Sequence, residues 1–278
     1  MTHRTLWRAG WNTVGLIVFA VMVFPVFWMI SSAFKQTGEL NSVTPTWFSH
    51  NPTLAHFRTA LHTPYFWTDI KNSLIVVAAT VVIAIMLAFL AAIALAKYRF
   101  TGRKLFIVLV IGIQMLPAVG LIIPLYVLLA KYGQVNKLTG VILVYLTTAL
   151  PFSVWTLRGF LFGIPKDLEE AAMVDGSTRL GAFVRILLPL VAPGLVATSV
   201  FTFITVWNEF VFANVLLSSP QNQTITLWLA SFTGGSIGAV DWGAIMAAST
   251  LIAMPVVIFF LLVQRRIAFG LTTGAVKA

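Results

Sequence analysis

Six long apolar blocks dominate the chain, and the short segments between them hold almost all of its charge. The blocks lie at about 12–34, 72–96, 105–130, 138–160, 190–217 and 242–263. A hydrocarbon core about 30 Å thick needs about 20 helical residues to cross it, and each block is long enough. Because unpaired backbone groups are too costly in lipid, helices are the expected spanning form. The sequence therefore predicts an all-α membrane protein with six transmembrane helices in one domain, 1–278.

The composition excludes an ordinary soluble protein. Only 9% of the residues are charged and 59% are hydrophobic, whereas a soluble domain typically carries about 25% charged residues. The formal net charge of +10 would suggest nucleic acid as a partner in a soluble chain. In a membrane protein the placement of charge matters more, so we expect lipid and no nucleic acid. The absence of cysteine excludes disulfides and thiolate chemistry.

The placement of Lys and Arg predicts the orientation in the membrane. With the N-terminus inside, thirteen of the 18 basic residues fall in inner segments. The positive-inside rule then places both termini and segment 165–189 in the cytoplasm, and loops 35–69 and 218–241 outside. An alternative makes the first block a signal peptide cleaved after Ser31-x-Ala33. That block is long for a signal peptide, and bulky residues precede the site.

Segment 165–189 mixes acids, bases and apolar residues at helical spacing, unlike its surroundings. Three acids near its start favour a first helix, because carboxylates interact well with the N-terminal end of the helix dipole. Asp175-Gly176 is expected to end this helix, with glycine in the left-handed conformation. Ser177 or Thr178 then caps a second helix, and Pro189 marks a change of direction. We expect an exposed helix-turn-helix bracket.

The bracket also resembles a known motif. Glu170-Ala171-Ala172, Gly176, and then Ile186, Leu188 and Pro189 match every fixed position of the EAA loop of ABC-importer inner-membrane subunits. The resemblance implies the type I ABC importer permease fold, with this segment as a coupling helix that docks into a cleft on a separate ATPase. The residues assigned to docking are Glu169, Glu170, Ala171, Ala172, Asp175, Gly176, Ile186, Leu188 and Pro189. The alternative is an amphipathic helix resting on lipid headgroups.

Polar residues inside the apolar blocks are candidates for a substrate path. They are Gln114, Tyr145, Trp207, Asn208 and Glu209. Glu209 is the acid placed well inside a block, where a charge costs a few kcal/mol and has to face protein or water. Two interpretations fit it equally: a wall of the substrate path, or a hydrogen-bond clamp between helices. A proton relay is a third, but no intramembrane His, Lys or Arg accompanies it.

Three further runs resemble carbohydrate-importer permeases related to the smaller membrane subunit of the maltose importer. They are Trp207-Asn208-Glu209-Phe210, Asp241-Trp242-Gly243 and the tail from Gly270 to Lys277. The resemblance implies import of a sugar, a di- or oligosaccharide, by alternating access. It implies as partners a second permease, usually a different chain, two ATPase subunits and an extracytoplasmic sugar-binding protein. Loop 218–241 would contact the binding protein, with Gln221, Trp228, Gly234 and Gly235 as candidates.

The chain has no G-x-x-x-x-G-K-[ST] phosphate loop, so we expect no cofactor and no enzyme activity in it. In the family it resembles, ATP and Mg²⁺ are held by the ATPase subunits. The remaining alternatives are an ABC importer of a non-sugar solute and an ion-coupled secondary carrier that uses Glu209. A carrier would show internal repeats, and none is convincing here.

Smaller patterns predict local features. Ala84, Ala88, Ala92 and Ala96 recur at steps of four and predict a helix face on which another helix packs closely. Pro117 and Pro124 are expected to bend the third block. His50, His56 and His62 lie in an outer segment without nearby acidic ligands, which favours solvated or interfacial histidines over a metal site.

Overall fold

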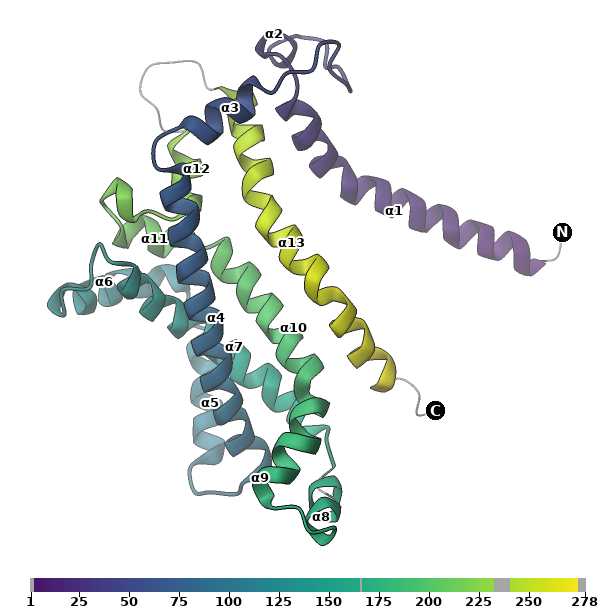
Figure 1. The fold of residues 1–278 in the computed structure, drawn as a ribbon, viewed down its shortest axis with the longest axis vertical. Coiled ribbons are helices and arrows are strands. Elements are labelled where there is room, and N and C mark those ends of the chain that lie inside the picture. The colour runs from purple at the N-terminus through teal and green to yellow at the C-terminus, as the bar shows by residue number, and fades with distance from the viewer. Residues whose placement is uncertain (1–2, 166, 233–240, 275–278) are drawn as a thin grey trace. The chain divides into compact units, whose positions relative to one another are not determined.

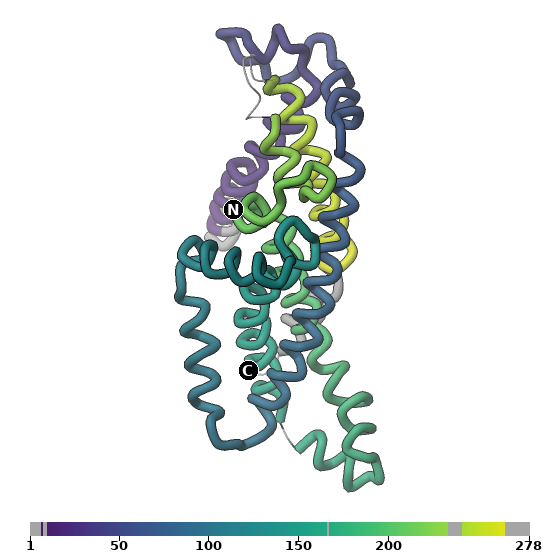
Figure 2. Tube along the Cα trace, turned by 90° about the vertical axis from the view of Figure 1, so that its left-hand side faces the viewer, coloured from purple at the N-terminus to yellow at the C-terminus, as the bar shows by residue number. Residues whose placement is uncertain are grey.

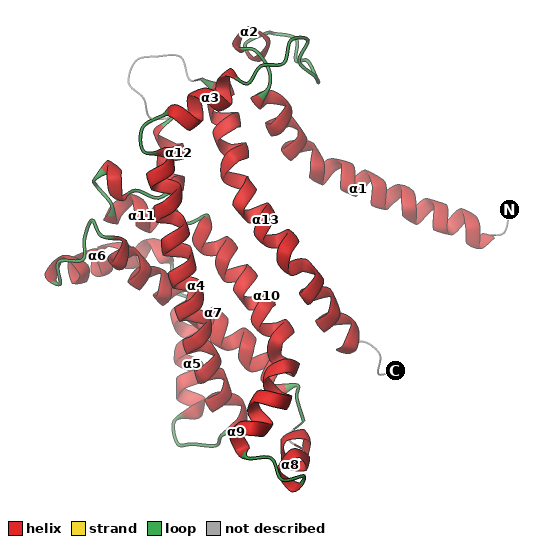
Figure 3. Cartoon of the chain, viewed as in Figure 1, coloured by secondary structure: helices red, strands yellow, loops and turns green. Residues whose placement is uncertain are grey.

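The computed structural model describes residues 3–165, 167–232 and 241–274, and every regular element in these ranges is helical (Figures 1 and 3). The all-α fold class is thereby confirmed. The chain divides into two compact units. Unit 1 comprises residues 1–66 and 228–255, and unit 2 comprises residues 67–227 and 256–278. The single domain expected from the sequence stays a prediction.

Unit 1 holds α1 (His3–Ala33), α2 (Thr37–Leu40), α3 (Ala55–His62), the end of α12 (Ile225–Ser231) and the first part of α13 (Trp242–Gly274). Helix α1 is long and apolar enough to span a membrane over Gly10–Ala33. Every residue from 10 to 26 is exposed. Since these side chains are almost all apolar and unit 1 itself leaves them uncovered, lipid or another protein surface has to cover them.

In unit 1 the Asp241-Trp242-Gly243 run begins α13 and packs against His56. Asp241 Oδ1 accepts a hydrogen bond from Ala244 N at 3.0 Å, which caps α13. The same oxygen lies 3.5 Å from His56 Nδ1, and His56 Nε2 lies 3.0 Å from the Lys35 carbonyl oxygen. A Cβ on Gly243 would lie within 2.2 Å of His56 Nε2. The buried ring of His56 therefore connects three segments, which corrects the expectation of a solvated or interfacial histidine.

The core of unit 2 is built by α4 (Phe66–Lys97), α7 (Leu138–Phe162) and α10 (Leu188–Trp207). Ala84, Ala88 and Ala92 are completely buried, which confirms the packing face predicted from the alanine spacing. Ala88 and Ala92 belong to a cluster with Leu95 of α4, Val154, Leu157 and Leu161 of α7, and Leu187 and Val191 at the start of α10. Small residues let the helix backbones approach, which is how membrane helices gain packing energy.

The predicted span over 105–130 is broken at Pro117, one of the two prolines expected to bend it. In its place lie α5 (Arg103–Gln114), the 3₁₀ turn Ala118–Leu121 and α6 (Ile122–Lys131), and the two arms are bent by 99° (Figure 2). Pro117 lies at the break with extended backbone, as its missing N–H favours. Pro124 falls in the first turn of α6, where no intrahelical donor is needed, so it does not bend the helix.

The predicted span 190–217 is wrong at both ends. A helical run begins at α9 (Arg179–Ala182), continues through the π turn Phe183–Leu187 and ends with α10 at Trp207. Pro189 therefore lies inside a continuous helical path and does not turn the chain. A π turn changes the backbone hydrogen-bond register, which accommodates a residue without an N–H just after it. The separate helix α11 (Val211–Leu216) follows Trp207.

Among the described residues, five helices are long and apolar enough to cross a membrane, or six if the bent α5–α6 pair counts as one span. The spans are Gly10–Ala33, Phe66–Lys97, Leu138–Phe162, Arg179–Trp207 and Trp242–Gln264. The remaining short elements are α8 (Asp167–Val174) and the 3₁₀ turn Pro220–Asn222. Of the six predicted spans, the α5–α6 pair is the one that crosses the membrane only if its two arms together form a single span.

We expect Gly194→Ala to destabilise unit 2. A Cβ on Gly194 of α10 would lie 2.5 Å from Phe160 Cγ of α7, so the ring or the helix has to move. Such overpacking costs about 1–3 kcal/mol in the free energy of unfolding. Gly159→Ala is the matched control, because a Cβ there meets nothing within 4 Å. Denaturant unfolding of both detergent-solubilised variants, followed by circular dichroism, checks this; equal stability would contradict the close approach.

Candidate functional site

Helix α8 presents the EAA segment and ends in a Schellman turn. Gly176 has φ +87°, its N–H donates to the Met173 carbonyl at 3.1 Å, and Ser177 N donates to the Ala172 carbonyl at 2.9 Å. These are the two bonds that satisfy the last carbonyls of a helix in this motif. The glycine predicted to end the first helix therefore adopts the left-handed conformation. Thr178 caps α9, because its Oγ1 accepts from Gly181 N at 3.1 Å.

The residues predicted to dock an ATPase differ in exposure. Glu170, Ala171, Asp175, Gly176 and Pro189 are exposed, Glu169, Ile186 and Leu188 are partly buried, and Ala172 is buried. Ala172 therefore packs against this chain and cannot be the residue that lets a partner approach. Leu168, Ala171 and Val174 are exposed at steps of three along α8, and Val174 is 87% exposed. One side of α8 thus carries uncovered apolar groups.

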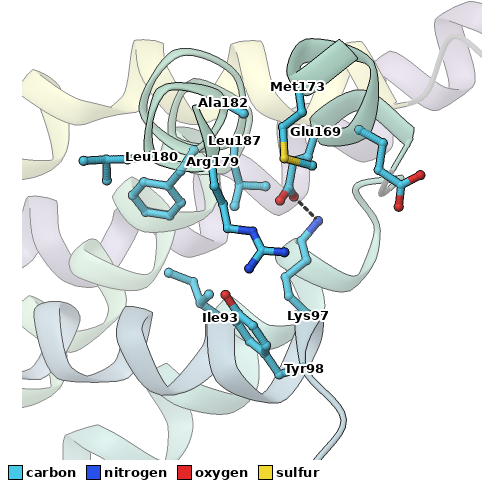
Figure 4. Close-up of a pocket in the computed structure, with 11 residues that line it drawn as sticks. Ile93, Lys97, Tyr98, Glu169, Met173, Arg179, Leu180, Ala182 and Leu187 are labelled. Atoms are coloured by element: carbon cyan, nitrogen blue, oxygen red, sulfur yellow. Dashed lines mark ion pairs between the residues drawn. The ribbon is translucent and has the colours of Figure 1, made fainter. Parts of the chain in front are cut away.

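An ion pair joins α8 to the end of α4. Lys97 Nζ contacts Glu169 Oε1 (Figure 4), and the side chains are only 10% and 25% exposed. Neither atom has a further hydrogen-bond partner among the described residues. Because a buried charge without a partner is costly, the pair has to persist for α8 to stay where it is. Lys97 was not among the predicted site residues; its position at the end of an apolar block gave no indication of its partner.

A cavity of about 530 Å³ lies between α4, α8 and α9, with the ion pair at its edge (Figure 4). Its apolar wall includes Ile93, Met173 and Leu187. The guanidinium group of Arg179 points into the cavity (Figure 4). The lining combines basic and acidic groups with apolar ones.

The predicted substrate-path residues separate into two groups. Tyr145 of α7 and Trp207 at the end of α10 are buried, and Trp207 Nε1 has no hydrogen-bond partner among the described residues. Asn208 and Gln114 are exposed, and Gln114 ends α5. Leaving a buried donor unsatisfied costs about 1–3 kcal/mol, and the Tyr145 hydroxyl and the Trp207 indole N–H both carry that cost in the described structure.

Glu209 lies in the break between α10 and α11, outside the membrane-spanning run. Its two carboxylate oxygens accept from Phe212 N at 2.9 Å and Ala213 N at 3.2 Å. Its own carbonyl accepts a hydrogen bond from Thr226 Oγ1 at 3.0 Å. The carboxylate therefore stabilises the start of α11 by accepting hydrogen bonds from its first turn, so the hydrogen bonds act within one helix and not between two. The Tyr145 hydroxyl interacts electrostatically with the same carboxylate.

The outer-loop candidates also differ. Gln221 is exposed, and its carbonyl accepts a hydrogen bond from Asn72 Nδ2 at 3.0 Å. Trp228 is 3% exposed and donates from Nε1 to the Pro64 carbonyl at 3.2 Å. A side chain so buried supports the fold of unit 1 and is not positioned to touch a partner. Gly234 and Gly235 lie outside the described residues.

With this geometry described, comparisons with known proteins give the family. Residues 84–273 match the model of the binding-protein-dependent transport system inner membrane component. The match covers more than half of the chain. The chain therefore belongs to that family of membrane-spanning transport subunits.

Two relatives and one solved structure are similar over nearly the whole chain. The diacetylchitobiose uptake system permease protein DasC of Streptomyces coelicolor is 45% identical over 99% of both chains. The trehalose/maltose transport system permease protein MalG of Thermococcus litoralis is 35% identical over 95% of both. A chain of a bacterial ABC transporter involved in alginate import has a TM-score of 0.80 at 20% identity, covering 95% of this chain and 98% of that one. That structure shows the shared fold.

We expect the Lys97–Glu169 pair to be measurable as a coupling energy. Lys97→Met and Glu169→Gln should each lower the free energy of unfolding by about 1–3 kcal/mol, because each leaves a largely buried polar group alone. The exchange Lys97→Glu with Glu169→Lys should recover part of the loss. A double-mutant cycle on the purified protein measures this. Lys104→Met, which removes an exposed cation from the same end of unit 2, is the control; additive single effects would contradict the pair.

Proposed function

We propose that this chain is the permease subunit of a binding-protein-dependent ABC importer that carries a sugar, a di- or oligosaccharide, into the cytoplasm. The family supports the transporter class, and the names of the two relatives support the sugar. The observation that carries the coupling role is the exposed apolar side of α8, held on this chain by Ala172 and the Lys97–Glu169 pair.

The proposed orientation has both termini and α8 in the cytoplasm of a bacterial inner membrane. The excess of Lys and Arg in the segments on one side supports it. Within unit 2, α8 and the turn after α4 lie at the same end (Figures 1 and 2). That end carries Lys97, Arg99, Arg103 and Lys104. The positive charge and the proposed coupling helix α8 therefore both support the same side as cytoplasmic.

The proposed complex contains a second, different permease, two ATPase subunits and an extracytoplasmic sugar-binding protein. ATP and Mg²⁺ belong to the ATPases, and this chain holds no cofactor. The exposed apolar surface of α1 suits contact with the second permease or with lipid. For the binding protein, exposed Gln221 is a better candidate than buried Trp228.

The proposed mechanism is mechanical. ATP draws the two ATPases together, and each carries a coupling helix with it. In this chain the displacement of α8 reaches α4 through the Lys97–Glu169 pair and α10 through the continuous helical run from Arg179. The helices then open the path toward the outside, where the binding protein releases its sugar. Differential contact with the two states of the ATPase pair supplies the free energy.

The sugar path is proposed beside Tyr145 and Trp207, with Gln114, Asn208 and Glu209 around it. The unsatisfied indole N–H of Trp207 supports a hydroxylated ligand there. The ion-coupled carrier is the weaker proposal. A carrier needs Glu209 free to exchange an ion, and both of its oxygens are committed to backbone donors of α11.

We expect Val174→Arg to prevent productive docking of the ATPase. A charge in the middle of an apolar interface is left without a partner, which should lower ATPase co-purification and sugar uptake at least tenfold. Val43→Arg is the matched control, with the same substitution at a valine that is 98% exposed in unit 1. Affinity purification of the complex and uptake into proteoliposomes measure both. Normal co-purification and uptake with Val174→Arg would exclude α8 as the docking helix.

The sugar assignment is tested by ATP hydrolysis. The assembled complex in liposomes, with its binding protein, should hydrolyse ATP several-fold faster when diacetylchitobiose, trehalose or maltose is supplied. The control is the same complex without binding protein, which should not respond. Stimulation by amino acids or peptides and by none of the sugars would establish the non-sugar importer. Solute flux that follows an ion gradient without ATP would establish the carrier.

A further inference from the structure

Unit 1 contains a second cavity, distant in sequence from α8. It has a volume of about 310 Å³, at the lower end of the range for small-molecule sites, about 300–1,000 Å³. The end of α1 supplies Trp28 and Ser32, α2 supplies Glu39, the start of α13 supplies Trp242, and Lys35 and Thr46 lie on the connecting segments. None of these residues was assigned a function from the sequence.

Two hydroxyl groups of this cavity have no partner. Ser32 is 2% exposed, and its Oγ makes no hydrogen bond in the part of the chain that the structure describes. Thr46 Oγ1 is also buried and makes no hydrogen bond there. Each buried unsatisfied group costs about 1–3 kcal/mol. Native structures rarely keep such groups without water or a ligand.

Lys35 adds a cation in the same place. It is 2% exposed, and its Nζ lies 3.9 Å from the centroid of the Trp28 ring. No carboxylate within the described ranges lies at ion-pair distance from it; Glu39 accepts from Ser49 Oγ at 2.7 Å and from His50 N at 3.0 Å. Burial lowers the pKa of Lys35, and Glu39 partly opposes this shift. The ammonium group has donors left for a further acceptor.

The charges in the cavity decide the class of ligand. Lys35 and Glu39 balance, so an anion such as a phosphate gains no net attraction. Lys35 offers charged donors, the carboxylate of Glu39 keeps lone pairs beyond the two that Ser49 and His50 use, and the hydroxyl groups serve either way. The exposed indole of Trp242 provides an apolar face for stacking. A neutral ring with hydroxyls around its edge and apolar C–H faces matches all of these features.

We infer that this cavity binds one ring of a neutral sugar. The site lies next to the ends of α1 and α13, at the side where the binding protein would release its cargo, so the inference rests on the proposed function. It would give unit 1 an entry site built from residues other than those of the path proposed beside Trp207. The Asp241–His56 contact and Gly243 hold Trp242 in place at its edge.

Equilibrium binding tests this without turnover. The assembled complex, in phosphatidylcholine nanodiscs and without binding protein or ATP, is titrated with radiolabelled diacetylchitobiose, trehalose and maltose. We expect at least one of these to bind, and Trp242→Ala and Lys35→Met to weaken binding at least tenfold. Trp67→Ala, at an exposed tryptophan of unit 2, is the control and should change binding less than twofold.

Ser32→Ala separates a ligand site from a structural role. Removing an unsatisfied hydroxyl should leave the melting temperature unchanged or raised, and should still weaken sugar binding several-fold. This variant also decides the matter if Trp242→Ala does not assemble. Unchanged binding with Ser32→Ala and Lys35→Met overturns the inference. So does binding of phosphatidylglycerol or glycerol phosphate in place of sugar, which would identify a lipid headgroup site.

The same variants distinguish the two proposals. If the wild-type complex takes up sugar with ATP but the cavity variants bind it normally, the entry site fails and the importer stands. If the wild-type complex neither transports nor binds any of the three sugars, the sugar importer fails and the entry site fails with it. Sugar uptake can also be measured in the absence of binding protein. A raised half-saturating sugar concentration in Trp242→Ala would then support both the importer and the entry site.

Discussion

Close packing of small residues is the constraint on which unit 2 depends. Lipid is as apolar as leucine, so burying apolar area against a neighbouring helix gives little net gain in a membrane. The buried alanines of α4 and Gly194 of α10 instead allow dispersion contacts over short distances. A core of this kind resists shear, so a force applied at one end of a helix reaches the other end.

A stiff core makes the continuous helical run from Arg179 to Trp207 important, because a displacement at its first turn is carried to its last. Its first turns lie at the edge of the cavity beside α8, and its last turn buries Trp207. The sequence suggested a turn at Pro189, which would have separated α9 from the membrane helix α10. A π turn keeps them in one rigid element, with the register change located at Phe183–Leu187. A helix that is continuous across this point transmits both translation and rotation.

The features predictable from the sequence were the local ones. Apolar length located the spans, although not the ends of the span 190–217, the alanine period gave the packing face, and Gly176 and Thr178 gave the turn between α8 and α9. Pairings between distant segments carried no such signal. Lys97 and Glu169 are separated by three α-helices and a 3₁₀ turn, and His56 reaches Asp241 across most of the chain. Glu209 was judged by the apolarity around it, whereas its role depends on a helix break that no period reveals.

The few acids of the chain show how selectively charge is used. Of 8 Asp and Glu residues, Glu39, Glu169, Glu209 and Asp241 each hold a hydrogen bond or an ion pair, and Asp69 is buried in the first turn of α4. The remaining three, Asp167, Glu170 and Asp175, are exposed, and all lie on α8 or directly after it. A basic chain that places its exposed carboxylates around one apolar helix face favours a partner with a basic rim and an apolar centre. Charges at such a rim set orientation and association rate, while the apolar centre supplies affinity.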